Sequence, residues 1–297
     1  MNPKFEGVMP AIITPFTEEG RHDPEGFRKN LEFFLKTGIS GIVVNGSTGE
    51  ASALTDEERI RNIEIASEMA RPSGRMIIAG IGTTTTGHAI RLSKDAEKAG
   101  ADALLALTPF SIIPRTDGLF RYYKEISEST NIPLLAYNLP AHTNVTITVE
   151  TLVELVDKEV IVGIKDSSGN ISALADMVMQ VGNRTSIITG GDDMLLQALV
   201  TGCSGAILAL GNLAPTICVE IYKAVKANDI PRAVGLYYKV LPLAKIISPA
   251  INFPAPVKEC VKQLGRPAGP CRSPIMPVTT AEVDEIRKAI TIAGLIN

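Results

Sequence analysis

The sequence has 297 residues, of which 45% are hydrophobic and 21% are charged, so it is long and apolar enough to bury a large core. Its 29 basic and 32 acidic residues give a formal charge of −3, and no basic cluster is present to bind a phosphate backbone. No apolar run approaches the roughly eighteen residues of a membrane-spanning helix, and the N-terminus lacks the pattern of a signal peptide. We therefore expect a cytoplasmic protein with no nucleic-acid partner and no membrane partner.

Eight short apolar segments, each typical of a buried strand, alternate with helical segments through the first 210 residues. The strand candidates are 8–14, 41–45, 76–81, 103–108, 134–138, 160–165, 186–189 and 205–210. Helix start signals lie between them, for example at residues 55–58 and 116–117. Eight units of a strand followed by a helix indicate a parallel sheet, and a closed (β/α)₈ TIM barrel of the α/β class suits that number.

An open, doubly wound sheet is the main alternative architecture. It usually carries a Gly-x-Gly-x-x-Gly turn after an early strand, whereas the nearest match, residues 80–87, has the wrong spacing. From residue 213 onward the pattern is helical, with candidate helices at 216–227, 230–247, 255–264 and 280–292. We therefore predict a barrel over residues 1–228 and a C-terminal helical extension over residues 229–297.

The cysteines and histidines are spaced too widely to predict a metal site or a disulfide framework. Cys203, Cys218, Cys260 and Cys271 form no Cys-x-x-Cys pair, so we expect them to be reduced and mostly buried. The three histidines are not paired at helical spacing either. A metal centre in this chain would have to rely on carboxylates alone.

Lys165 stands at the end of the sixth strand candidate, where the apolar run changes to a polar turn. Alternation places Ile161, Gly163 and Lys165 on one face of this strand, so a sheet covered on both sides would direct the ammonium group into its interior. Burial disfavours the charged form of a lysine, which lowers its pKa and supplies the neutral amine that attacks a carbonyl group. A lysine that reaches solvent from a strand end is the alternative interpretation.

Three further strand ends carry polar or glycine-rich segments, and in a barrel such ends meet at one face. Residues 46–50 combine glycines with two hydroxyl groups, a pattern that holds a carboxylate or caps a helix. Tyr137 ends the fifth strand, one strand away from Lys165, where its phenol transfers protons or only packs. Asp192 and Asp193 follow the seventh strand, where they accept hydrogen bonds from substrate hydroxyls or cap a helix.

Taken together, the segments 46–50, 137–140, 163–169 and 190–193 resemble, in order and spacing over nearly the whole chain, the dihydrodipicolinate synthase and N-acetylneuraminate lyase superfamily. This resemblance implies a (β/α)₈ barrel and a class I aldolase or lyase mechanism without a metal or an organic cofactor. It implies a 2-oxo acid (pyruvate) and an aldehyde as the small-molecule partners.

The same resemblance implies roles for individual residues. Lys165 would form the imine with the 2-oxo acid, Tyr137 would move protons, and Ser47 would join Tyr137 in a hydroxyl relay. The residues expected to bind substrate are Thr48, Gly49, Ser167, Gly191, Asp192 and Ile207.

Two positions depart from the pattern of the superfamily. Ser111 stands where a tyrosine usually completes the proton relay across a subunit contact, so water or another residue would have to replace that phenol. His142 stands where dihydrodipicolinate synthases carry an arginine, and it lacks the fork with which arginine binds a carboxylate. Leu208 and Ala209 argue against a large sugar such as sialic acid.

These departures favour reversible cleavage of a 2-keto-3-deoxy sugar acid to pyruvate and an aldehyde, with 4-hydroxy-tetrahydrodipicolinate synthase as the alternative. Two interpretations from other classes remain: a non-catalytic barrel that binds 2-oxo acids, and a metal-dependent aldolase that uses Asp192 and Asp193. The resemblance also predicts a homotetramer, with a subunit contact at the loop after the fourth strand candidate. The apolar residues that favour this contact run from that strand into the loop and are Leu104, Leu105, Leu107, Phe110, Ile112 and Ile113.

Overall fold

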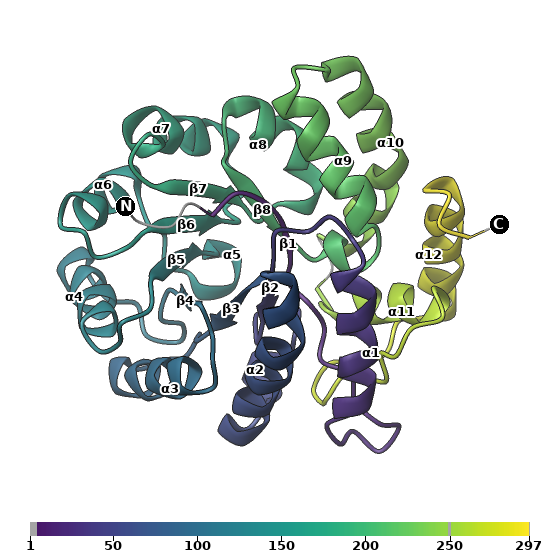
Figure 1. Cartoon of the computed structure of the whole chain (residues 1–297), viewed down its shortest axis with the longest axis horizontal. Coiled ribbons are helices and arrows are strands. Elements are labelled where there is room, and N and C mark those ends of the chain that lie inside the picture. Colours follow the sequence, from purple (N-terminus) through teal and green to yellow (C-terminus); the bar gives the residue numbers. More distant parts are fainter. Residues whose placement is uncertain (1–4, 249–250, 297) are drawn as a thin grey trace.

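The computed structural model describes residues 5–248 and 251–296, and within them eight parallel strands form one sheet in the order β1-β8-β7-β6-β5-β4-β3-β2. The ring closes between β1 and β2, because Ala11 bridges to Val43 and the Ile12 N–H donates to the Val43 carbonyl at 3.0 Å. The predicted TIM barrel is therefore confirmed (Figure 1). The strands are β1 (Gly7–Pro10), β2 (Gly41–Val44), β3 (Met76–Gly80), β4 (Ala103–Leu107), β5 (Leu134–Asn138), β6 (Gly163–Asp166), β7 (Ser186–Thr189) and β8 (Gly205–Leu208).

Helices surround the strands and cover the outside of the barrel (Figure 1). Those in the barrel part are α1 (Pro24–Leu35), α2 (Asp56–Ala70), α3 (Thr86–Lys98), α4 (Thr116–Ser127), α5 (Pro140–Thr143), α6 (Val149–Asp157), α7 (Ile171–Val181), α8 (Leu195–Thr201) and α9 (Pro215–Lys226). Short 3₁₀ helices span Ala51–Ala53, Arg71–Ser73, Asp192–Met194 and Leu210–Asn212. The start signal at residues 55–58 is confirmed as a capping box, in which Thr55 Oγ1 accepts from the Glu58 N–H and a Glu58 carboxylate oxygen accepts from the Thr55 N–H.

The sixth strand differs from its prediction, because it begins at Gly163 rather than at residue 160. Ile164 packs in the outer core, as alternation predicts, whereas Ile161 also joins that outer core instead of the barrel interior. Residues 160–162 precede the strand, so the pleat that fixes alternate faces does not govern them. The prediction for Gly163 and Lys165 is unaffected, since both lie within the strand.

The apolar residues form two cores, one between the sheet and its helices and one inside the barrel. The outer core takes residues from strands and helices alike, which is why the helical segments have one apolar face. The inner core is filled by side chains from strands and loops, namely Phe5, Met9, Ala11, Val43, Ile78, Ala103, Leu105, Leu135, Tyr137, Leu139, Ile188 and Ile207. The barrel is therefore packed inside, and its ligand space lies above this packing, at the strand ends.

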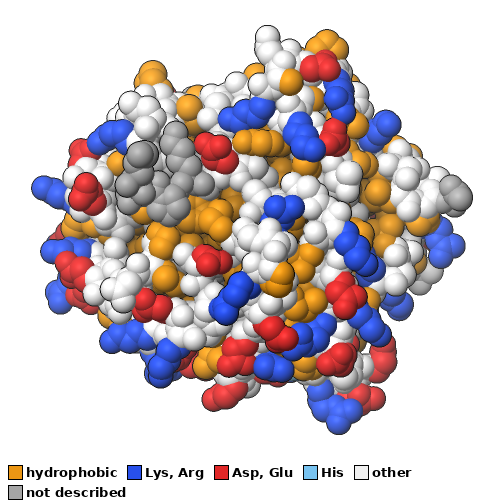
Figure 2. All heavy atoms as spheres, in the orientation of Figure 1, with side chains coloured by type: hydrophobic (Ala, Val, Ile, Leu, Met, Phe, Trp, Pro, Cys, Tyr) orange, Lys and Arg blue, Asp and Glu red, His pale blue; other side chains and the backbone are white. Residues whose placement is uncertain are grey.

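The helical extension consists of α10 (Ile230–Ile247), α11 (Ala255–Gln263) and α12 (Thr280–Ile292), close to the predicted bounds. It lies at one side of the barrel, where α10 packs against α9 and α12 packs against α10 and α11 (Figure 1). The domain boundary at residues 228 and 229 stays a prediction. Of the helices in the described ranges, none is long and apolar enough to cross a membrane. Acidic and basic side chains are interspersed on the face shown in Figure 2.

A buried ion pair joins the extension to the barrel. Lys258 Nζ in α11 lies 2.6 Å from Glu50 Oε1 in the loop after β2, and both side chains are almost fully buried. Lys258 Nζ also donates to the Pro270 carbonyl and lies 4.1 Å from the centre of the Phe16 ring. Burial lowers the pKa of Lys258, and the Glu50 carboxylate opposes that change. Each charge is therefore tolerated only because the other is present.

We predict that Lys258→Met lowers the free energy of unfolding by about 3–5 kcal/mol, because it leaves the Glu50 carboxylate buried without its counter-charge. The double variant Glu50→Gln with Lys258→Met removes both charges and should recover a large part of that loss. Urea denaturation of the wild type, both single variants and the double variant measures the coupling. Additive losses in the double variant would contradict this prediction.

Candidate active site

Lys165 and Tyr137 lie side by side because β5 pairs with β6 in a register that makes them direct neighbours. Lys165 Nζ lies 4.1 Å from the centre of the Tyr137 ring, and each residue is only 6% exposed. An ammonium or amine over an aromatic face is attracted by the ring quadrupole, which holds the lysine tip in place. The structure thus brings together the two residues that the sequence analysis placed on adjacent strand ends.

Gly190, at the end of β7, leaves the space that the lysine stem occupies. A Cβ atom at this position would lie 2.6 Å from Lys165 Cε and would also collide with Ser167 Oγ. Any larger residue would therefore displace the lysine or the serine. The glycine is required here by the close approach of the Lys165 side chain.

The residues that follow Tyr137 and Lys165 fix the ends of their strands. Asn138 Nδ2 donates to Asp166 Oδ1 at 2.6 Å, and Asn138 Oδ1 accepts from the Ile147 N–H at 2.9 Å. Asp166 Oδ2 in turn accepts from the Ser168 hydroxyl at 2.8 Å. Because Asn138 and Asp166 are buried, these bonds hold β5 and β6 in register next to the lysine.

Two adjoining cavities open at this end of the barrel. The inner cavity, of about 260 Å³, contains Lys165, and the outer cavity, of about 330 Å³, lies beside it. Both cavities are lined by Ser47, Tyr137, Leu139, His142 and Phe253. The two cavities therefore offer space for two small molecules, and Tyr137 lies in the lining of both.

The turn after β2 places Ser47 and Thr48 at the cavities. Ser47 lines both of them, and Thr48 is buried and lines the inner one with Lys165. The Gly49 N–H donates to the Gly46 carbonyl at 3.1 Å, and the Gly49 carbonyl accepts from Thr14 Oγ1 at 2.8 Å. The backbone of Gly49 thus holds the turn in shape, while Ser47 and Thr48 are the residues that face the ligand space.

Ser167, Gly191 and Asp192 also line the inner cavity. Ser167 Oγ is buried and has no hydrogen-bond partner in the described part of the chain, so it is free to bond to a ligand. Asp192 Oδ1 accepts from the Leu210 N–H at 2.7 Å. Ile207, which was expected to bind substrate, is fully buried in the inner core and lines neither cavity.

The two departures from the superfamily pattern lie in different places. His142, in α5, is exposed and lines both cavities. Ser111 is exposed in the loop after β4, with a left-handed backbone (φ 70°), and its neighbour Phe110 is the residue that lines the outer cavity. Within this single chain, His142 therefore reaches the ligand space and Ser111 lies outside the cavity lining.

The C-terminal part of the chain contributes a wall of the cavities that no local sequence pattern predicts. Phe253 lines both cavities, and residues 272–275 line the outer one. These residues follow Lys165 by about 90 to 110 positions, and no local pattern marks them as neighbours of the site. The segment 272–275 carries one arginine together with a serine, a proline and an isoleucine. Only the topology of the fold shows that this segment borders the site.

Three of the four cysteines are buried, which confirms the prediction of mostly buried thiols. The reduced state of the thiols stays a prediction. Residues 5–248 and 251–296 contain no group of three or more His, Cys, Asp or Glu side chains arranged to hold a metal ion. In the described structure the carboxylate of Asp192 bonds to backbone instead.

We predict a pH-dependent contribution to stability from Asp192. Burial raises the pKa of this carboxyl to about 7, although the Leu210 N–H and the Lys165 charge oppose that change. Since an unfolded aspartate has a pKa of about 3.9, this carboxyl stabilises the fold most below pH 4, and the contribution is lost as the pH rises toward 7.

Between pH 4 and pH 7, the contribution of Asp192 to the free energy of unfolding should fall by about 4 kcal/mol. Urea denaturation from pH 4 to pH 8 should show a smaller decline for Asp192→Asn than for the wild type. Parallel pH profiles of the two proteins would contradict the assignment.

The chain matches the model of the "Dihydrodipicolinate synthetase family" over residues 4–293. It is 36% identical to the 4-hydroxy-tetrahydrodipicolinate synthase of Methanothrix thermoacetophila, over 97% of this chain and 96% of that protein. It is 37% identical to the protein of the same name from Thermodesulfovibrio yellowstonii, over 98% of this chain and 99% of that one.

The fold also matches that of solved structures. The crystal structure of chloride-inhibited dihydrodipicolinate synthase from Acinetobacter baumannii, complexed with pyruvate, superposes with a TM-score of 0.94 at 32% identity, covering 98% of this chain and 99% of that one. The family model, the relatives and the fold agree with the resemblance drawn from the sequence. The chain therefore belongs to the dihydrodipicolinate synthetase family, whose members are class I, Schiff-base-forming lyases.

Proposed function

We propose that this enzyme forms an imine between Lys165 and pyruvate and joins the bound pyruvate to an aldehyde, as a 4-hydroxy-tetrahydrodipicolinate synthase. The observation that carries the proposal is the buried Lys165 Nζ over the Tyr137 ring, at an inner cavity next to a second cavity of similar size. The names of the relatives support this activity above the sugar-acid cleavage that the sequence analysis favoured.

The first half of the reaction uses the inner cavity. The neutral amine of Lys165 attacks the C2 carbonyl carbon of pyruvate, and the carbonyl oxygen leaves as water to give the imine. The protonated imine withdraws electrons, so a proton can be removed from C3 to form an enamine. In this proposal Tyr137 carries these protons. Its ring lies against the Lys165 amine, and Tyr137 lines both cavities.

The groups around the lysine suit a small 2-oxo acid. The Thr48 segment supplies a hydroxyl and backbone amides to the pyruvate carboxylate, and the unpartnered hydroxyl of Ser167 supplies a further hydrogen bond. Ser47 lines both cavities and so connects the pyruvate carboxylate side to the proton path of Tyr137. The enamine then attacks the aldehyde carbon from the outer cavity, and the aldehyde oxygen takes up a proton. The amino group of the aspartate semialdehyde acceptor next displaces the Lys165 amine from the imine carbon, which closes the ring of the product and frees the lysine.

A second candidate, cleavage of a 2-keto-3-deoxy sugar acid, is favoured because no described residue lining the outer cavity offers a free guanidinium group to an acceptor carboxylate. The guanidinium group of Arg272, which lines this cavity, is engaged in two bonds of 2.6 Å with the Glu58 carboxylate. The position of the superfamily arginine is occupied by His142, which offers no bidentate contact to an acceptor carboxylate. An uncharged, hydroxylated aldehyde would need no such contact.

An acceptor assay decides between these two activities. Pyruvate is supplied with either aspartate semialdehyde or glyceraldehyde, and kcat/KM is measured for each, with Lys165→Ala as the inactive control. We expect kcat/KM for aspartate semialdehyde to exceed that for glyceraldehyde by about tenfold or more. Contacts to a single substrate group can provide a ratio of this size. A preference for glyceraldehyde of the same size would replace the synthase with the sugar-acid lyase.

We predict that Tyr137→Phe lowers kcat by about a hundredfold or more, because it keeps the ring under Lys165 and removes only the proton-carrying hydroxyl. Tyr123→Phe is a matched control, since its phenol donates to the Ala106 carbonyl at 3.3 Å in the outer core. Steady-state kinetics of both variants measure the effect. A Tyr137→Phe enzyme as active as Tyr123→Phe would reduce Tyr137 to a packing residue.

We also propose that the enzyme assembles as a homo-oligomer, with a homotetramer as the predicted state. Of the residues expected at the contact, Leu104 and Leu105 are buried in the outer and inner cores as part of β4, so they do not contribute to it. The support from this chain is the loop after β4, where Ile112 and Ile113 are 63% and 66% exposed next to the cavity-lining Phe110. Apolar side chains exposed together in this way are typical of an interface. The cytoplasmic location and the lack of nucleic-acid partners stay predictions.

A further inference from the structure

The outer cavity has one wall that comes from the C-terminal part of the chain. Its inner side is formed by residues of the barrel, among them Tyr137 and His142. The residues that line it from beyond position 229 are Phe253, Pro254, Arg272, Ser273, Pro274 and Ile275. Of these, only Phe253 also lines the inner cavity that contains Lys165. The segment 272–275 therefore borders only the second compartment.

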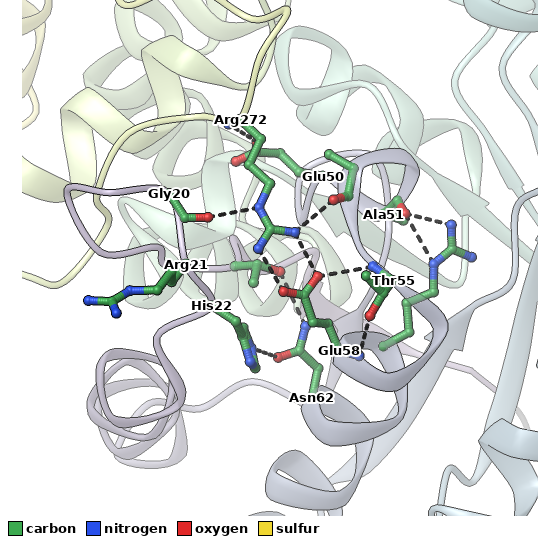
Figure 3. A network of polar contacts seen from close by, with 12 residues as sticks. Gly20, Arg21, His22, Glu50, Ala51, Thr55, Glu58, Asn62 and Arg272 are labelled. Carbon is green, nitrogen blue, oxygen red and sulfur yellow. Dashed lines mark hydrogen bonds and ion pairs between the residues drawn. The ribbon is translucent and has the colours of Figure 1, made fainter.

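Arg272 anchors this segment to the loops after β1 and β2 (Figure 3). Its guanidinium makes two bonds of 2.6 Å to the Glu58 carboxylate and donates to the carbonyls of Gly20 and Ala53 at 3.0 and 2.8 Å. It also lies 4.3 Å from the centre of the Phe16 ring. A guanidinium with this many partners fixes the backbone that follows it.

The backbone amide of Arg272 links the same segment to the pyruvate side. Its N–H donates to Glu50 Oε2 at 2.9 Å, and Glu50 directly follows the turn that contains Thr48. The other carboxylate oxygen of Glu50 pairs with Lys258. One buried carboxylate thus holds both the turn at the inner cavity and the wall of the outer cavity.

A second set of hydrogen bonds joins the segment around Asn252 to the backbone of Met276. The Met276 N–H donates to Asn252 Oδ1 at 3.1 Å, and Asn252 Nδ2 donates to the Met276 carbonyl. Phe253 and Pro254 come directly after Asn252 and line the cavity. The backbone of Met276 therefore joins residues 252–254 and 272–275 into one connected surface, although about twenty residues separate the two segments in the chain.

We propose that this surface determines which aldehyde the enzyme accepts, and that Ile275 contacts the substituent of the aldehyde. Ile275 is the branched apolar residue of the segment 272–275, it is partly buried, and it lines the outer cavity. A rigid apolar wall restricts the length of an acceptor by its shape. The inference rests on the proposed function, because it assigns the outer cavity to the aldehyde.

Three variants test the wall. Ile275→Ala enlarges the cavity, Ile275→Phe reduces it, and Met276→Ala changes the next residue, which is 68% exposed and lies outside the cavity lining. Each is assayed with pyruvate and straight-chain aldehydes from two to six carbons. Reductive trapping of pyruvate with borohydride is measured in parallel, because it reports the inner cavity alone.

We expect Ile275→Ala to raise the ratio of kcat/KM for the six-carbon over the two-carbon aldehyde by about tenfold, and Ile275→Phe to lower it similarly. Met276→Ala should keep the ratio of the wild type, and all three should trap pyruvate as the wild type does. The proposal is overturned if both Ile275 variants keep the wild-type ratio, or if Met276→Ala shifts it equally. A wild type that traps no pyruvate would instead refute the proposed function.

Discussion

The contact between the Lys165 amine and the Tyr137 ring is the interaction around which the rest of the site is arranged. It exists because β5 and β6 pair in a register that makes the two residues neighbours, and because Gly190 leaves room for the lysine stem. The bond between Asn138 and Asp166, one residue further along each strand, keeps that register. Reaction geometry in this enzyme is thus a consequence of strand pairing in a closed barrel.

Much of this arrangement could be predicted from the sequence, since it depends on short-range patterns. Eight apolar segments with helices between them predict the barrel, and alternation within one strand predicts the direction of Lys165. Alternation predicts side-chain direction only within a paired strand. Ile161 precedes the first residue of β6, so alternation does not apply to it, and it packs in the outer core. Ser111 and His142 favour the sugar-acid lyase, whereas the names of the relatives favour the synthase.

The C-terminal contribution could not be predicted, because it depends on contacts between residues more than two hundred positions apart. Arg272 bonds to Glu58 and Glu50, and Lys258 pairs with Glu50. In the sequence each of these residues resembles an ordinary charged surface residue. Only the fold shows that the buried Glu50 joins the Lys258 amine to the backbone N–H of Arg272, and that the C-terminal part thereby forms one wall of the outer cavity. The extension is a structural addition to the barrel that also shapes its outer cavity.

The central claim is that Lys165 is the residue that binds pyruvate covalently. Lys258 is the other almost completely buried lysine in the described part of the chain, and its ion pair with Glu50 occupies its amine. The most direct measurement is mass spectrometry of peptides after reduction of the pyruvate complex with borohydride. The account predicts one adduct, on the peptide that contains Lys165 and absent in Lys165→Ala. An adduct on Lys258 or another lysine, or no adduct in the wild type, would contradict it.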